Sequence, residues 1–191
     1  MGCQACHLWR FGTQTVFGEG NPHARIVFVG EQPGDKEDVE GRPFVGPAGQ
    51  LLMSAMEKAG IDRDDVYITN AVKHFKWAPA GNRRIHQKPN VREQRACRPW
   101  LEAEIARIRP DALLLLGATA AQAVLGPQFK LTQNRGKFVP SEMAPHVLAT
   151  LHPSAILRMP DEEQRETALT SLMEDLKMVS EVVRQPRGYL G

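Results

Sequence analysis

Short apolar runs alternate with longer amphipathic stretches along most of the chain. The apolar runs occupy Arg25–Gly30, Val66–Asn70, Ala112–Gly117 and Val147–Thr150. A short apolar run without polar alternation is typical of a strand that is buried on both faces, as strands are in a parallel sheet. The pattern therefore predicts a parallel sheet in the core of the protein.

Helical spacing of apolar residues marks the stretches between these runs. The predicted helices cover Ala48–Ala59, Val91–Ile108, Ala118–Leu125 and Asp161–Val183. Pro99 lies within the second of them and predicts a kink or a restart, because proline removes a helical hydrogen bond. Strands that alternate with helices predict a three-layer α/β/α fold. We expect residues 1–191 to form a single domain whose tail, residues 185–191, is frayed.

Two polar segments, Glu31–Pro47 and His74–Asn90, interrupt this alternation and are predicted to be long loops. Loops of about 15 residues inside a compact domain are more often functional than filler. Polar side chains also stand where strands end: Glu31 and Gln32 follow the first strand, Asn70 ends the second and His152 follows the fourth. The carboxyl ends of parallel strands meet at one edge, which is where ligands bind in such sheets. Each residue alone also suits a plain turn, but three polar strand ends together favour a site.

Charge is nearly balanced overall, with 24 Lys and Arg against 22 Asp and Glu, but it is unevenly distributed. Lys73–Arg98 holds eight cations and one acid, whereas Asp161–Glu181 holds seven acids and two cations. A face that binds a polyanion and a merely solvated surface both explain this asymmetry. No apolar run approaches the roughly 20 residues of a membrane span, and the first residues lack the apolar stretch of a signal peptide. We therefore expect a cytoplasmic protein.

Three cysteines are present, and two of them form the pair Cys3-x-x-Cys6, with Cys97 far along the chain. This spacing without a secretory context indicates metal or redox chemistry rather than a disulfide framework. Zinc, a redox pair and an iron–sulfur cluster all remain compatible with it.

Four ordered motifs carry a family resemblance: Gly30–Asp38, Gly41–Gly49, Thr69–Lys73 and His152–Ser154. Together they resemble the uracil-DNA glycosylase superfamily, and most of all its iron–sulfur branch, often called family 4. The segments Gly30–Gly34 and Arg83–His86 look like the UdgX type within that branch. The resemblance implies a central four-stranded parallel sheet between helices. It also implies uracil-containing DNA as partner, free uracil as product and a protein that acts as a monomer.

The resemblance implies roles for residues of the expected site. Phe44 would stack on the base, Asn70 would read uracil through its carboxamide, and His152 would hydrogen-bond uracil O2 and stabilise the departing base. Gln32 lies where it would line the pocket. Plain alternatives remain, with Phe44 in the core and His152 as a helix cap. The resemblance also implies a 4Fe–4S cluster held by four residues, which are Cys3, Cys6, His74 and Cys97. His74 stands where family 4 has a cysteine, and three cysteines with one histidine also suit structural zinc.

His86 is the most distinctive residue of the resemblance. In the UdgX type, the matching histidine becomes covalently joined to DNA, and Glu31 would hold its other ring nitrogen. Arg83 and Arg84 would contact phosphates, whereas Asn82 replaces a lysine of the UdgX loop. Three alternatives are a glycosylase that turns over freely, a non-catalytic iron–sulfur module that binds DNA, and a metal-dependent nucleotide hydrolase. The last is suggested by the acids between Asp35 and Glu40.

Overall fold

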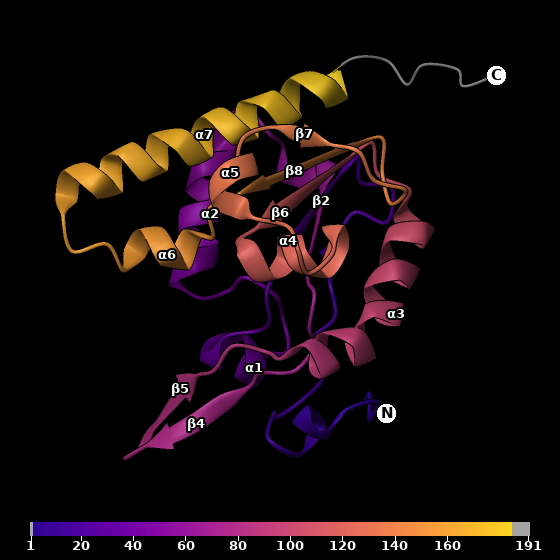
Figure 1. Cartoon of the computed structure of the whole chain (residues 1–191), viewed down its shortest axis with the longest axis vertical. Coiled ribbons are helices and arrows are strands. Elements are labelled where there is room, and N and C mark those ends of the chain that lie inside the picture. Colours follow the sequence, from indigo (N-terminus) through magenta and orange to yellow (C-terminus); the bar gives the residue numbers. More distant parts are fainter. Residues whose placement is uncertain (1, 185–191) are drawn as a thin grey trace.

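A central sheet organises the computed structural model, which describes residues 2–184. Its strand order is β1-β3-β2-β6-β8-β7. The four inner strands are parallel: β2 (Ile26–Gly30), β3 (Val66–Asn70), β6 (Ala112–Leu116) and β8 (His146–Thr150). The predicted parallel sheet is therefore confirmed (Figure 1).

The sheet has six strands rather than four, because an antiparallel strand is added at each edge. These are β1 (Glu19–Gly20), which pairs with β3, and β7 (Phe138–Val139), which pairs with β8. Each spans two residues, which is too short to leave a pattern in the sequence.

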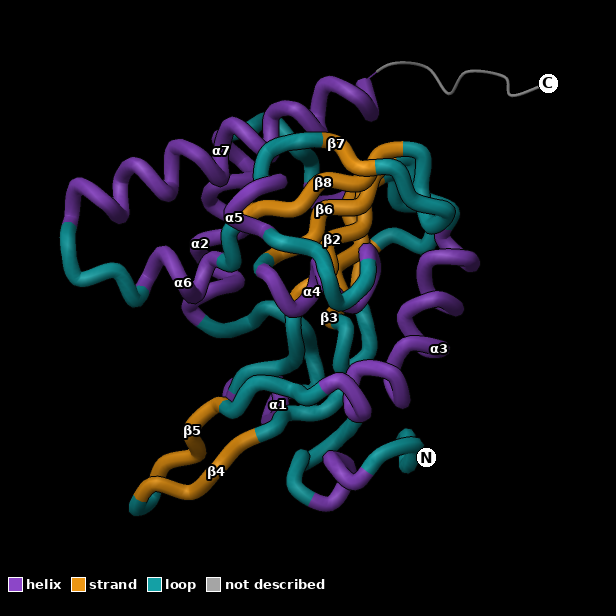
Figure 2. Tube along the Cα trace, viewed as in Figure 1, coloured by secondary structure: helices purple, strands orange, loops and turns teal. Residues whose placement is uncertain are grey.

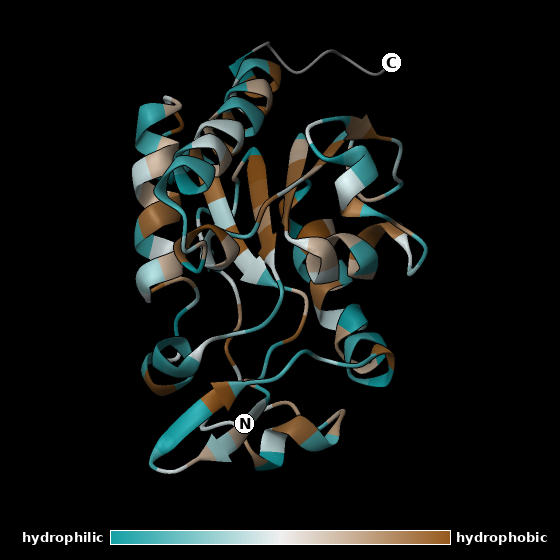
Figure 3. Ribbon diagram, turned by 60° about the vertical axis from the view of Figure 1, so that its left-hand side comes forward, coloured by the Kyte–Doolittle hydropathy of each residue, from teal (hydrophilic) through white to brown (hydrophobic). Residues whose placement is uncertain are grey.

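Helices cover both faces of the sheet and complete the three predicted layers. On one face, α2 (Pro47–Lys58), α6 (Pro153–Leu157) and α7 (Glu162–Arg184) pack on alternate strand residues such as Phe28. On the other, α3 (Val91–Ile108) and α4 (Ala118–Leu125) pack on the intervening ones such as Val29. Phe28 and Val29 are both fully buried, and Figure 3 shows these hydrophobic strands between the helices. The continuous apolar runs arise from this burial on two faces.

Both segments that were predicted as loops contain regular structure. The first holds α1 (Asp35–Glu40), and the second holds a hairpin of β4 (Trp77–Ala80) and β5 (Arg83–His86). The hairpin projects from the body beyond the carboxyl ends of the inner strands (Figure 2). The shorter remaining elements are η1 (His7–Arg10), η2 (Arg63–Asp65) and α5 (Leu131–Asn134).

Pro99 does not restart α3, since one helix spans Val91–Ile108. Its side chain lies on the exposed side of the helix, so that its ring meets solvent and only one main-chain hydrogen bond is lost. No helix within residues 2–184 is long and apolar enough to cross a membrane. The single domain stays a prediction, and the tail at residues 185–191 lies outside the described residues.

Candidate active site

A cavity of about 720 Å³ opens at the carboxyl ends of the inner strands. Six predicted site residues line it, and these are Glu31, Gln32, Phe44, Asn70, His86 and His152. They come from the loops after β2 and β8, the end of β3, the loop before α2 and the end of the hairpin. The structure thus gathers residues that are up to 121 positions apart in the sequence.

Phe44 and Asn70 meet where Gly30 leaves room for them. A methyl group at Gly30 would lie 2.7 Å from Cζ of Phe44 and would collide with the amide oxygen of Asn70. Phe44 has a left-handed backbone with φ of 56°, a conformation that costs a non-glycine residue of order 1 kcal/mol. The loop is held in place by Glu37, whose carboxylate accepts a hydrogen bond from Gly46 N at 2.9 Å. The aromatic ring is therefore positioned by the fold rather than by local preference.

The Phe44 ring also lies beside the imidazole of His152, with centroids 6.0 Å apart and planes at 29°. Asn70 is 2% exposed and lines the cavity. Its carboxamide is not among the fully buried polar groups without a partner in the described residues, so the small exposed part of the residue is open to the cavity. The amide is thus available to a planar ligand in the cavity.

His152 is held in one tautomer by the first turn of α6. Ser154 N donates to His152 Nδ1 at 3.1 Å, so that Nδ1 is an acceptor and the ring proton lies on Nε2. Burial lowers the pKa of His152 to about 4, the nearby Glu31 charge opposes this, and Arg158 adds to the lowering. A neutral imidazole with Nε2–H can donate a hydrogen bond to a carbonyl oxygen of a bound base. The helix-cap alternative is confirmed, and the cap uses only Nδ1, so that the predicted bond from Nε2–H to uracil stays a prediction.

His86 lies at the end of β5 with half of its side chain exposed and Nε2 at 3.0 Å from Glu31 Oε1. Burial acts to raise the pKa of Glu31, but hydrogen bonds from His86 and Thr119 outweigh it and the net shift is downward. Glu31 is therefore a carboxylate that can hold one imidazole nitrogen. This leaves Nδ1 of His86 for other chemistry.

Two predicted site residues are occupied in supporting the hairpin. The Gln32 amide donates to the carbonyl oxygens of Lys76 and Gln87, both at 3.1 Å, and accepts from Lys76 N. The Arg84 guanidinium binds Asp35 and Asp38 at 2.5 and 2.6 Å and lies over the rings of Phe75 and Trp77. Their direct roles toward substrate stay predictions. Arg83, on the opposite face of β5, is exposed.

Sequence reasoning did not foresee the contributions of Asp35 and Asp38, which were considered only as possible metal ligands. It also missed the buried ion pair of Lys73 with Glu104, at 2.5 Å, in which Lys73 Nζ donates to the Asn70 main-chain oxygen at 2.7 Å. The basic residue three positions after Asn70 was the available signal.

The two cysteines of the N-terminal segment lie close to Cys97 of α3. Cys97 and Leu8 form a small apolar cluster with Val72, against which Cys6 packs. Three N–H groups donate to sulfur: Ala5 N and Trp100 Nε1 to Cys3 Sγ, and Lys73 N to Cys97 Sγ. Thr15 links Cys3 N to His74 Nε2, and His74 Nδ1 is buried with no partner in the described part of the chain.

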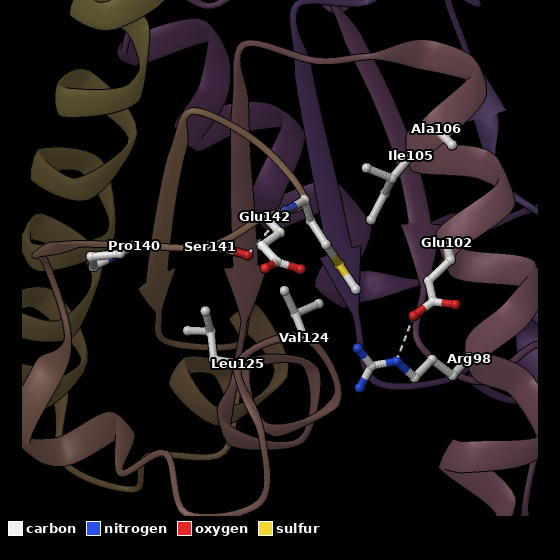
Figure 4. A pocket seen from close by; sticks show the side chains of 10 residues that line it. Arg98, Glu102, Ile105, Ala106, Val124, Leu125, Pro140, Ser141 and Glu142 are labelled. Carbon is white, nitrogen blue, oxygen red and sulfur yellow. Dashed lines mark hydrogen bonds and ion pairs between the residues drawn. The ribbon is translucent and has the colours of Figure 1, made fainter.

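A second hollow, of about 470 Å³, lies between α3, the end of α4 and the loop before β8 (Figure 4). Arg98 and Glu102 of α3 form an ion pair at its rim, at 2.6 Å. None of the predicted site residues lines this hollow.

An α/β/α fold that presents a stacking ring, a cavity-lining amide and a neutral histidine at its strand ends defines a protein that binds and acts on a planar base. The profile of the Uracil DNA glycosylase superfamily matches residues 17–177, and the chain belongs to that family. A Type-4 uracil-DNA glycosylase of Thermotoga maritima is 41% identical over 96% of this chain and 90% of its own length. A Type-4 uracil-DNA glycosylase of Sulfurisphaera tokodaii is 39% identical over 99% of this chain and 84% of its own length. A Type-5 uracil-DNA glycosylase of Pyrobaculum aerophilum is 35% identical over 61% of this chain and 55% of its own length.

Proposed function

We propose that this uracil-DNA glycosylase excises uracil from DNA and then captures the abasic sugar through His86. The observation that carries the second step is the contact of His86 with Glu31 in the cavity that also holds Asn70 and His152. The uracil enters beside Phe44, and Asn70 reads its edge. His152 Nε2–H donates to O2 as negative charge develops on the leaving base.

Base loss breaks the bond between uracil N1 and C1′ of the sugar. The bonding electron pair leaves with uracil, which takes a proton from solvent, and C1′ becomes electron-poor. The free ring nitrogen of His86 then donates its lone pair to C1′ and forms a carbon–nitrogen bond. The ring becomes an imidazolium whose remaining N–H stays on Glu31. A nucleophile held close to C1′ competes with water at a very high effective molarity.

Turnover is the second candidate, and the comparisons favour it. The Thermotoga and Sulfurisphaera relatives are named as Type-4 uracil-DNA glycosylases, which indicates catalysis with water as the final nucleophile. In that case His86 only contacts the DNA, and free abasic product is released.

A denaturing gel of the protein incubated with a uracil-containing oligonucleotide separates the two candidates. We expect an SDS-resistant adduct with the parent protein and none with His86→Gly, which still releases uracil because water enters the vacated space. His23→Ser is the matched control, since His23 is exposed at the opposite end of β2. If the parent protein instead accumulated free abasic DNA over many turnovers, the capture step would be wrong and the turnover candidate would hold. Binding without uracil release would leave only a DNA-binding module.

We further propose that Cys3, Cys6, His74 and Cys97 hold a 4Fe–4S cluster. The donor types suit it, because thiolates bind such clusters, imidazole can replace a thiolate, and N–H groups commonly surround the sulfurs. The unpartnered His74 Nδ1 supports the assignment. Within the described residues, no three His, Cys, Asp or Glu side chains are arranged to hold a single metal ion. A bound cluster would join the N-terminal segment to α3 and supply a structural link.

Metal content tests this proposal directly. We expect a brown protein with about four iron atoms and four sulfides per chain, a cluster that survives in His74→Cys and is lost in Cys97→Ala. A colourless protein that contains one zinc per chain and remains fully active would contradict it.

A further inference from the structure

Exposed aromatic side chains gather in one part of the molecule. Among the described residues, the aromatic side chains that are at least 38% exposed are Trp9, Phe11, Phe17, Trp100 and Phe138. Four of the five belong to the N-terminal segment or to α3 beside it, and only Phe138 lies at the far edge of the sheet. Phe17 and Trp100 pack against each other with centroids 5.4 Å apart. Phe11 is 52% and Trp9 39% exposed, and neither packs against another exposed aromatic residue of this group.

The segment that carries Trp9 and Phe11 has no negative charge. Residues 2–18 contain no Asp or Glu, and the exposed Arg10 places its guanidinium 5.5 Å from the Trp9 ring centroid. The neighbouring carboxylates are already engaged. Glu93 is buried, binds Lys76 and also lies 3.4 Å from His7 Nε2, and Asp38 accepts from Thr13 and Arg84. An open aromatic surface with a cation and no exposed acid of its own suits a polyanion that contains planar rings.

This segment is continuous with the hairpin that carries His86. Trp77 Nε1 donates to the main-chain oxygen of Phe11 at 2.9 Å. In the hairpin, Trp77 pairs directly with His86. Figures 1 and 2 show the N-terminal segment and the hairpin at the same end of the molecule. A strand whose target nucleotide reaches the cavity therefore has this segment next to its path.

We propose that residues His7–Phe11 form a second DNA contact, in which Trp9 and Phe11 stack on bases that flank the uracil and Arg10 neutralises a phosphate. Stacking on a side-chain ring requires an unpaired base, so the flank that this contact binds is single-stranded. The inference rests on the proposed function, because it takes uracil-DNA at the His86 cavity as given.

Excision kinetics on substrates of two lengths test the contact. A uracil trinucleotide reaches only the cavity, whereas a single-stranded 15-mer with a central uracil also reaches the flanking surface. We expect Trp9→Ala and Phe11→Ala each to raise the half-saturating concentration of the 15-mer about tenfold and to leave the trinucleotide unchanged. Phe138→Ala is the control, because Phe138 on β7 is 38% exposed and lies at the far edge of the sheet, and it should behave as the parent on both substrates.

Each arm of the experiment has a contrary outcome. Equal losses on both substrates would mean that the aromatic residues support the site structurally, and unchanged 15-mer kinetics would mean that they face solvent or another protein. Pairing the flanks with a complementary strand should remove most of the advantage of the long substrate, and an advantage that persists in duplex would overturn the stacking. Excision of neither substrate by the parent would instead refute the proposed function.

Discussion

At the scale of residues, His152 gives the site a defined pH dependence. Burial lowers its pKa to about 4 in the folded protein, whereas an ordinary histidine titrates near 6.5. Between these values the unfolded chain binds more protons, so the stability that His152 contributes is lost as pH falls from about 6.5 to 4. Since the neutral ring also carries the proposed hydrogen bond to uracil, excision should persist to about pH 4.

Denaturant titration and excision rates across pH 4 to 7 check this prediction. In His152→Gln, the unfolding free energy should lose the share of its decrease between pH 6.5 and 4 that His152 causes. Excision should be slow at every pH, because the Nε2–H donor of His152 is replaced. A rate that falls with a midpoint near pH 6.5 in the parent, and not in the variant, would show that His152 titrates as an ordinary histidine.

Single residues also show what sequence alone could supply. Glu31, Asn70 and His152 could be placed at one site because strand ends are recognisable and parallel strands align them. The roles of Gln32 and Arg84 in supporting the hairpin could not be predicted. Gln32 binds two main-chain carbonyls, and Arg84 binds two acids of α1, a helix that was not predicted. Partners of this kind become neighbours only after folding.

At the scale of elements, the hairpin is the feature that the sequence pattern concealed. Its strands have four residues each and no fully buried residue, and β4 contains a proline, so the alternation of a half-buried strand is absent. The Gly81-Asn82 turn was the signal that could have revealed it, because a two-residue turn with a glycine at positive φ, here 59°, is typical of hairpins. The inner strands, by contrast, were predicted nearly to the residue, since burial on both faces requires continuous apolar runs.

The hairpin depends on Arg84, and its loss should affect capture more than base release. Arg84 joins β5 to α1 through Asp35 and Asp38, while His86 lies two residues further along the same strand. We expect Arg84→Ala to reduce the rate of adduct formation about 10–100-fold, because a nucleophile displaced by about 1 Å loses that much. Uracil release measured on the same samples should fall less, since Asn70 and His152 lie on other elements. Equal losses of both would place Arg84 on the substrate rather than behind the hairpin.

At the scale of the whole molecule, the basic stretch is less available than its composition suggests. Of the eight cations in Lys73–Arg98, four are held in ion pairs, namely Lys73, Lys76, Arg84 and Arg98. The other four are exposed, and these are Arg83, Lys88, Arg92 and Arg95. Charge counting could predict a basic face but could not predict which cations the fold would neutralise, because most of their partners come from α1 and from distant positions of α3.

Salt dependence of binding separates the two groups of cations. Each phosphate neutralised on single-stranded DNA contributes about 0.7 to the slope of log affinity against log salt. Arg95 and Arg98 make a matched pair, since both are exposed arginines on α3 and only Arg98 is bonded to a neighbouring acid, Glu102 at 2.6 Å. We expect Arg95→Gln to lower the slope by about 0.7 and Arg98→Gln to leave it unchanged. The same result should hold for DNA without uracil, because phosphates carry no base identity. Identical slopes for both variants and the parent would place the DNA away from α3 and confine its footprint to the hairpin and the cavity.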